Sequence, residues 1–314
     1  MSELGASAAL YPFALDAARD ALMLLPMRES EYRAASFLDE RLGRHGSWMA
    51  AASVAQAMGG VRDVRPLHFI FHAGHVGSTL LSRLLDETGE VLPLREPLPL
   101  RTIANDFSEP RLELLLKLWE RGFESTRAVV LKATSATERL AVTLLAMRPQ
   151  AKAVLLNVSA ESYVATLLAG ENSAADLNAH GAERLHRLGR FVDRPPRPTT
   201  LGELAAMSWL AERLTQAETA RVLGERVLAI DFDCMLETLP QTLAQVLSHF
   251  GLSPERADRL ADSAVLSRYS KAPEHAYTPG LRQRLLAQAR ESYRAEIAAA
   301  LAWIEALKIP AALL

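Results

Sequence analysis

A glycine-containing loop at residues 72–79, with the sequence HAGHVGST, has the residue types best suited to binding an anion. It follows a short apolar run and precedes apolar residues at helical spacing, which predicts a turn from a strand into a helix. Such a turn directs several backbone N–H groups and the positive end of the helix dipole to one place. Gly74 and Gly77 would let the backbone approach an anion closely. Ser78 and Thr79 add hydroxyl donors, although Ser78 would equally suit a tight turn in which it only caps the helix.

The established nucleotide-binding patterns do not fit this loop. The P-loop pattern G-x-x-x-x-G-K-[ST] fails because Ser78 stands where its lysine would be, and the dinucleotide pattern G-x-G-x-x-G fails as well. A P-loop kinase or NTPase is therefore the weakest interpretation, since the chain also lacks a clear acidic partner for a metal ion. Asp231 and Asp233 are expected to be structural, and no other residues have convincing metal-ligand spacing, so we expect no metal site.

A second candidate is Lys132, which ends the apolar run AVVLK. A buried strand that ends in a lysine places the charge at the sheet edge where ligands bind in open α/β proteins. The plainer alternative is a lysine that simply reaches solvent after its strand.

The elements that would position these residues alternate along the chain. Short apolar runs predict buried strands, and longer runs with apolar residues at helical spacing predict helices. This alternation predicts an α/β fold with a mainly parallel central sheet, covered on both faces and carrying helical insertions. The predicted strands are 67–71, 128–132, 152–157 and 226–232, and the predicted helices are 111–122, 136–148, 160–170, 203–223, 239–251 and 281–308.

Outside this alternation, residues 1–65 carry apolar residues at helical spacing in 29–42 and 47–58. We therefore expect a mostly helical N-terminal extension packed on a main domain that spans 66–314. The Pro-rich stretch 193–202 predicts an exposed loop.

Composition limits the classes of function. The 314 residues are 49% hydrophobic and 23% charged, as in a globular protein with a sizeable core. A net charge of −2 gives no bulk attraction to nucleic acid or to an anionic membrane. Cys234 is the single cysteine, which excludes a disulfide framework. With no signal-like start and no apolar run of about 18–20 residues, we expect a cytoplasmic protein without a membrane span.

The run Gly77-Ser78-Thr79-Leu80-Leu81 after a strand resembles the 5′-phosphosulfate loop of sulfotransferases that use 3′-phosphoadenosine 5′-phosphosulfate (PAPS). The resemblance covers about residues 66–280, and the order of elements is most similar to the tyrosylprotein-type enzymes and their bacterial relatives. It implies a P-loop NTPase-like three-layer sandwich that moves a sulfuryl group directly from PAPS to a hydroxyl or amine. The cofactor-binding residues implied in this loop are Gly74, His75, Val76, Gly77, Ser78, Thr79 and Leu80.

The same resemblance assigns catalytic roles. Glu96 falls where these enzymes carry the base that takes a proton from the acceptor hydroxyl; otherwise it would be a surface residue paired with Arg95 or Arg101. Lys132 would stabilise charge on the oxygen that bridges phosphate and sulfate. His75 falls on a position that is Lys or Arg in the family, and histidine can carry positive charge near neutral pH. Because His72 matches nothing in the family pattern, we expect it to make only a local hydrogen bond.

Two further segments of the family pattern contact the nucleotide. In the 3′-phosphate segment the arginine position falls on Val158 and the serine position on Thr166, so a bidentate phosphate contact is lost. Ser270 and Lys271 resemble a Ser-Lys pair in a C-terminal segment that closes over the nucleotide phosphates. The residues that could supply the missing positive charge are Arg268, Arg282 and Arg284.

One alternative remains beside sulfuryl transfer. The chain could keep the sulfotransferase fold and have lost PAPS chemistry, serving as a binding or regulatory module or using another phosphate donor. The sequence identifies neither the acceptor, a small molecule or a peptide, nor the oligomeric state, and it gives no reason to expect nucleic acid as a partner.

Overall fold

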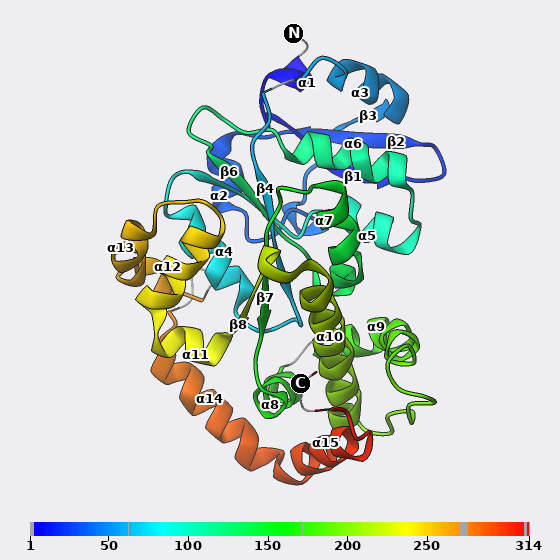
Figure 1. Ribbon diagram of the computed structural model, residues 1–314, viewed down its shortest axis with the longest axis vertical. Coiled ribbons are helices and arrows are strands. Elements are labelled where there is room, and N and C mark those ends of the chain that lie inside the picture. Colours follow the sequence, from blue (N-terminus) through cyan, green and yellow to red (C-terminus); the bar gives the residue numbers. More distant parts are fainter. Residues whose placement is uncertain (1–2, 62, 171–172, 270–275, 311–312, 314) are drawn as a thin grey trace.

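The computed structural model describes residues 3–61, 63–170, 173–269, 276–310 and 313 (Figure 1). Five parallel strands form its central sheet in the order β5-β6-β4-β7-β8. They are β4 (Leu67–His72), β5 (Val91–Arg95), β6 (Ala128–Lys132), β7 (Ala153–Asn157) and β8 (Val227–Asp231). The predicted α/β class with a parallel central sheet is confirmed.

The order of the strands determines where a ligand can bind. From β4 the chain moves outward to β5, returns through β6, and then crosses to β7 on the other side of β4. The winding therefore reverses at β4, and ligands of open α/β sheets bind beyond the carboxyl ends of the strands at such a reversal. The loop that follows β4 lies at this position.

Side chains of successive strand residues point to opposite faces and fill two separate apolar cores. Ile70 and Val154 belong to the first core, whereas Phe69 and Leu155 belong to the second. Because each face of the sheet buries its own core under helices, the domain has three layers. The first face is covered by α4 (Ser78–Asp86), α8 (Ala160–Ala169), α10 (Leu201–Leu223) and α12 (Leu239–His249), and the second by α5 (Leu98–Asn105), α6 (Glu109–Trp119) and α7 (Ala141–Met147).

The N-terminal segment contains an antiparallel sheet that the sequence analysis did not predict. Its strands are β1 (Leu10–Asp16), β2 (Ala21–Pro26) and β3 (Ser47–Ala50), beside the short helices α1 (Glu3–Ala6), α2 (Glu29–Ala34) and α3 (Ala51–Met58) (Figure 1). Short apolar runs such as ALMLLP have no periodicity that separates a strand from a helix. This segment packs into the second core through Tyr11 and Leu22, among others.

The C-terminal region differs from the single helix predicted for 281–308. It forms two helices, α14 (Pro279–Ser292) and α15 (Arg294–Ala306), which meet at Tyr293 and change direction there (Figure 1). Tyr293 leaves the helical conformation with φ −115° and ψ 21°. α14 packs on α8, whereas α15 packs on α10 as well as on α8, so tertiary packing overrides a continuous helical pattern.

The remaining α-helices of the described chain are α9 (Ser173–Leu188), α11 (Phe232–Glu237) and α13 (Ala257–Ala261). None of the helices in the described part of the chain combines the length and the apolarity that a membrane crossing requires.

Candidate active site at the carboxyl edge of the sheet

The loop after β4 has the backbone expected of an anion-binding turn. Gly74 and Gly77 adopt φ angles of 91° and 77°, in the left-handed region that favours glycine. Gly77 is the N-cap residue of α4, and within the described chain no side chain caps this helix. Ser78 therefore does not play the capping role that the plainer interpretation gave it. The strand, the loop and the helix lie where the sequence predicted them.

The side chains of the loop differ in what they can offer a ligand. Val76 and Leu80 are buried in the first core, so only their backbone can take part in binding. The His75 side chain is exposed, on a residue with a φ of 56°. The hydroxyl of Thr79 is buried and, among the described residues, has no hydrogen-bond partner. An unsatisfied buried hydroxyl costs about 1–3 kcal/mol, so this donor in the first turn of α4 is suited to a ligand oxygen.

Gly77 is required by contact as well as by conformation. A Cβ atom there would lie 2.0 Å from the ring of Phe232, at the start of α11. Gly89 provides a comparison, because it has a φ of 74° and nothing within 4 Å of a Cβ.

We expect Gly77→Ala to lower the free energy of unfolding by about 2–4 kcal/mol, from the left-handed backbone plus overpacking against Phe232. The matched variant Gly89→Ala should cost only about 1 kcal/mol, because it carries the conformational penalty alone. Urea denaturation of both variants measures the difference. Equal losses in the two variants would show that Phe232 does not restrict the loop.

Glu96 and Lys132 meet at the carboxyl edge of the sheet although 35 residues separate them. Lys132 ends β6 opposite Arg95 of β5, and the next backbone N–H, that of Glu96, donates to the Lys132 carbonyl at 2.7 Å. Their side chains form an ion pair in which the Lys132 side chain is 1% exposed and that of Glu96 13%. Arg41 Nη2 lies 3.2 Å from the second carboxylate oxygen of Glu96.

This environment determines the charge of Glu96. Burial opposes ionisation, but the positive charges of Lys132 and Arg41 outweigh it and lower the pKa of Glu96 from 4.5 to about 2. Glu96 also adopts a φ of 58°, which is uncommon for a residue other than glycine. A strained backbone that carries an ionised, nearly buried carboxylate is typical of functional sites.

The alternative pairing predicted for Glu96, with Arg95 or Arg101, is wrong. Arg95 is fully buried and binds Asp86, with 2.8 Å between Nη2 and Oδ2. Arg101 binds Asp39 at 3.1 Å. Both arginines therefore form ion pairs with other carboxylates, and Glu96 pairs with Lys132 instead.

The N-terminal segment contributes residues that the sequence analysis missed. The Phe37 ring lies against the Arg41 guanidinium, 3.3 Å from ring centroid to Cζ, and 5.7 Å from Lys132 Nζ. The Leu38 N–H donates to the carbonyl of Arg95 at 2.7 Å, which fixes this segment at the end of β5. No local pattern relates Phe37 and Arg41 to Glu96, because the contact depends on how the N-terminal segment packs.

His72, at the end of β4, makes the local hydrogen bond that we expected: its Nδ1 accepts from the Gly74 N–H at 3.0 Å. It is also buried, and its Nε2 lies 3.5 Å from Lys132 Nζ. This second contact was not predicted, although the position of His72 at the end of the central strand was a signal for it.

The residues assigned to the nucleotide 3′-phosphate do not form a phosphate site. Val158 is buried, and its N–H donates to the side chain of Asn157 at 2.8 Å. The Thr166 hydroxyl donates to the Ser162 carbonyl in its own helix at 2.7 Å. A guanidinium does lie nearby, since Arg290 of α14 donates from Nη2 to the Ser162 hydroxyl at 3.2 Å.

The C-terminal candidates are only partly described. Ser270 and Lys271 lie outside the described residues. Arg282 binds Asp233 at 2.6 Å, and its guanidinium carbon is 5.2 Å from the centroid of Phe232, the ring that contacts Gly77. Arg268 and Arg284 are exposed. Arg282 therefore has a contact that leads to the loop through Phe232.

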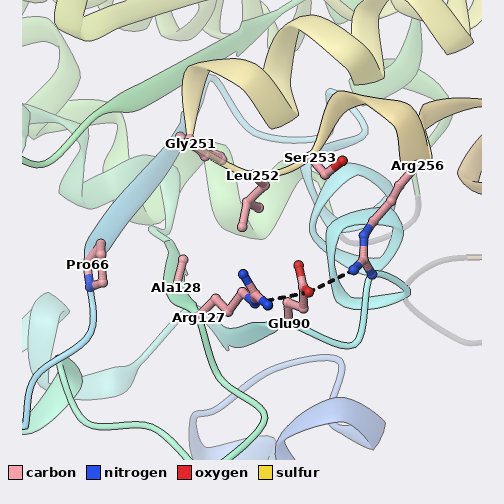
Figure 2. A pocket seen from close by; sticks show the side chains of 9 residues that line it. Pro66, Glu90, Arg127, Ala128, Gly251, Leu252, Ser253 and Arg256 are labelled. Carbon is pink, nitrogen blue, oxygen red and sulfur yellow. Dashed lines mark hydrogen bonds and ion pairs between the residues drawn. The ribbon is translucent and has the colours of Figure 1, made fainter.

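A pocket of about 230 Å³ lies at the opposite edge of the sheet, where the strands begin (Figure 2). Glu90 bridges Arg127 and Arg256 across it, at 3.1 Å and 2.7 Å. Because its charged groups pair with one another and it lies away from Lys132, we interpret this pocket as structural.

Comparison with solved structures finds sulfotransferases. One from Alicyclobacillus acidocaldarius is 17% identical with a TM-score of 0.40, covering 77% of this chain and 95% of that one. Another, from Mycobacterium tuberculosis H37Rv, is 15% identical with a TM-score of 0.41, covering 79% and 81%. No protein-family model and no curated protein matches the sequence. These likenesses are remote, so the chemistry of the site has to follow from its own residues.

Proposed function

We propose that this chain transfers a sulfuryl group from PAPS to a hydroxyl or amine of a small-molecule or peptide acceptor in the cytoplasm. The observation that supports this most is the meeting of three features from three different strands. The loop after β4 offers donors to an anion, Lys132 ends β6, and the ionised Glu96 follows β5. An anion site beside an ammonium and a base matches what transfer of a charged group requires.

The residues of the loop suit the 5′-phosphosulfate of PAPS. In the proposal, the backbone of residues 74–80 and the buried hydroxyl of Thr79 hold its oxygen atoms. The 3′-phosphate needs other partners than Val158 and Thr166. We assign it to Arg290 and Arg282, whose guanidinium groups lie beside α8 and beside Phe232.

The proposed step is a direct in-line transfer. The acceptor oxygen forms a bond to sulfur while the bond between sulfur and the bridging oxygen breaks, and its electron pair stays on the phosphate. The acceptor proton moves to Glu96, and Lys132 stabilises the negative charge on the bridging oxygen. Here the lysine and the loop dipoles have the role that Mg²⁺ has in kinases.

The ion pair between Lys132 and Glu96 implies that the donor binds before Glu96 acts as a base. A carboxylate with a pKa of about 2 is a weak base while the ammonium binds it. When Lys132 turns to the donor, burial becomes the main influence and raises the basicity of Glu96. Binding of the donor would therefore activate the base.

One observation favours the alternative, a protein that keeps the fold and has lost PAPS chemistry. Val158 is buried and apolar where the family carries a phosphate-binding arginine. A regulatory module or an enzyme with another phosphate donor would not need that arginine.

A thermal-shift experiment separates these possibilities. We expect adenosine 3′,5′-bisphosphate to raise the melting temperature, and ATP with Mg²⁺ to leave it unchanged, because the loop lacks the lysine that grips a triphosphate. At a ligand concentration one hundred times the dissociation constant, the stabilisation should be about 2.7 kcal/mol. No response to the bisphosphate would favour the module, and a response to ATP with Mg²⁺ alone would favour an NTPase.

A further inference from the structure

His72 lies inside the candidate active site. It ends the central strand β4, is 5% exposed, and lies between the anion-binding loop on one side and Lys132 on the other. Pairing of β4 with β6 places Ile70 opposite Lys132. His72 lies two residues further along β4, so its side chain is on the same face of the sheet as that of Ile70. Two rigid strands therefore hold His72 and Lys132 together.

The contact with the loop determines which ring nitrogen carries the proton. Nδ1 accepts the N–H of Gly74 at 3.0 Å, so it presents a lone pair there. A proton on Nδ1 would face that N–H, which disfavours both the other neutral tautomer and the imidazolium. The neutral ring must then carry its proton on Nε2.

The Nε2–H is 3.5 Å from the Lys132 nitrogen, which is itself only a donor. Both groups are donors, so an oxygen atom bearing negative charge that reaches both would accept from both. This places a second donor where the proposed reaction develops charge.

We propose that His72 is a further catalytic residue, whose Nε2–H donates, together with Lys132, to the oxygen that bridges phosphate and sulfate. This rests on the proposed function. With a buried donor beside Lys132, the exposed His75 does not have to supply the positive charge that a lysine or arginine supplies at this position in the family. The electron pair released by sulfur stays on that oxygen, which keeps it in the product adenosine 3′,5′-bisphosphate.

Two substitutions separate the donor from the loop contact. In His72→Asn the amide oxygen can replace Nδ1 and accept from Gly74, but no donor remains at the position of Nε2. In His72→Gln the longer side chain places an amide N–H near that position. We expect kcat to fall about 100-fold in the asparagine variant, the usual cost of one donor to developing charge, and less than 10-fold in the glutamine variant. The opposite order would show a structural role and overturn the proposal.

Nitrogen NMR of the histidine side chains tests the proposal without turnover. In the wild-type protein we expect His72 to be protonated on Nε2 only, with the Nε2 signal changing when adenosine 3′,5′-bisphosphate binds and the Nδ1 signal nearly constant. A ring protonated on Nδ1, or an Nε2 signal that ignores the bound bisphosphate, would overturn the proposal. A wild-type protein that binds the bisphosphate and transfers no sulfuryl group would refute the proposed function, whereas an Nε2 signal that ignores the bisphosphate in a protein that does transfer sulfuryl groups would refute the role of His72 alone.

Discussion

Glu96→Gln should lower sulfuryl transfer about 1000-fold while adenosine 3′,5′-bisphosphate still binds, because a positioned general base contributes about 10²–10⁴ in rate. Glutamine keeps the shape of the side chain and an oxygen that can accept from Lys132, but it cannot take a proton. The loop proposed to bind the donor follows β4, whereas the replaced carboxylate follows β5. Steady-state kinetics and calorimetric titration of the same preparation measure the two effects.

This variant also removes a buried carboxylate from Lys132, so its folding has to be measured alongside. Breaking one side of a buried ion pair typically costs about 3–5 kcal/mol. A thermal melt shows whether the variant is folded at the assay temperature. Glu87→Gln, at an exposed position directly after α4, is the matched control and should change neither property. Turnover within a few-fold of the wild type would exclude Glu96 as the base.

Lys132→Met should reduce kcat by about 100- to 1000-fold, because the ammonium would no longer stabilise charge on the bridging oxygen. Methionine is close to lysine in length and volume, and the site is nearly closed to solvent, so packing should change little. Lys117→Met is the control, since Lys117 forms an exposed ion pair with Glu113. A loss in the control as large as in Lys132→Met would show a general effect of removing positive charge.

The same variant should change the dependence of the rate on pH. In the wild type, a pKa of about 2 for Glu96 keeps the carboxylate ionised throughout the pH range in which sulfuryl transfer would be assayed. Without Lys132, burial is the main remaining influence and raises the pKa of Glu96. The acidic limb of kcat/KM against pH should therefore move upward in Lys132→Met. An unchanged profile would show that the lysine does not control the base.

Stability should follow the same linkage. The pKa of Glu96 is lower in the folded protein than in the unfolded chain, so its ion pair stabilises the fold above about pH 4.3. This contribution is lost as the pH falls from there toward 2. Urea denaturation at pH 6 and pH 3.5 should show a larger acid loss for the wild type than for Lys132→Met. If Lys132→Met lost as much stability as the wild type between pH 6 and pH 3.5, the ion pair would not be the source of the acid loss.

Much of the architecture could be predicted from local sequence. The strands at 67–72, 128–132, 153–157 and 227–231 are short apolar runs between helical patterns, and their alternation predicts a parallel sheet. The turn after β4 could also be predicted, because Gly74 and Gly77 can adopt the left-handed conformation that its backbone requires. In β1 and β2 the apolar residues have no clear period, so these strands could not be predicted from the sequence.

The sequence by itself determined the class of fold, the glycine-containing turn after β4 and the lysine at the end of β6, because each depends on neighbours within a few residues. Only the tertiary structure decided what surrounds them. Glu96 pairs with Lys132, and Arg41 and Phe37 close over that pair. His72 faces the same lysine because β4 and β6 lie side by side. These contacts join residues tens of positions apart, and their energies depend on burial, which no local pattern of residue types contains.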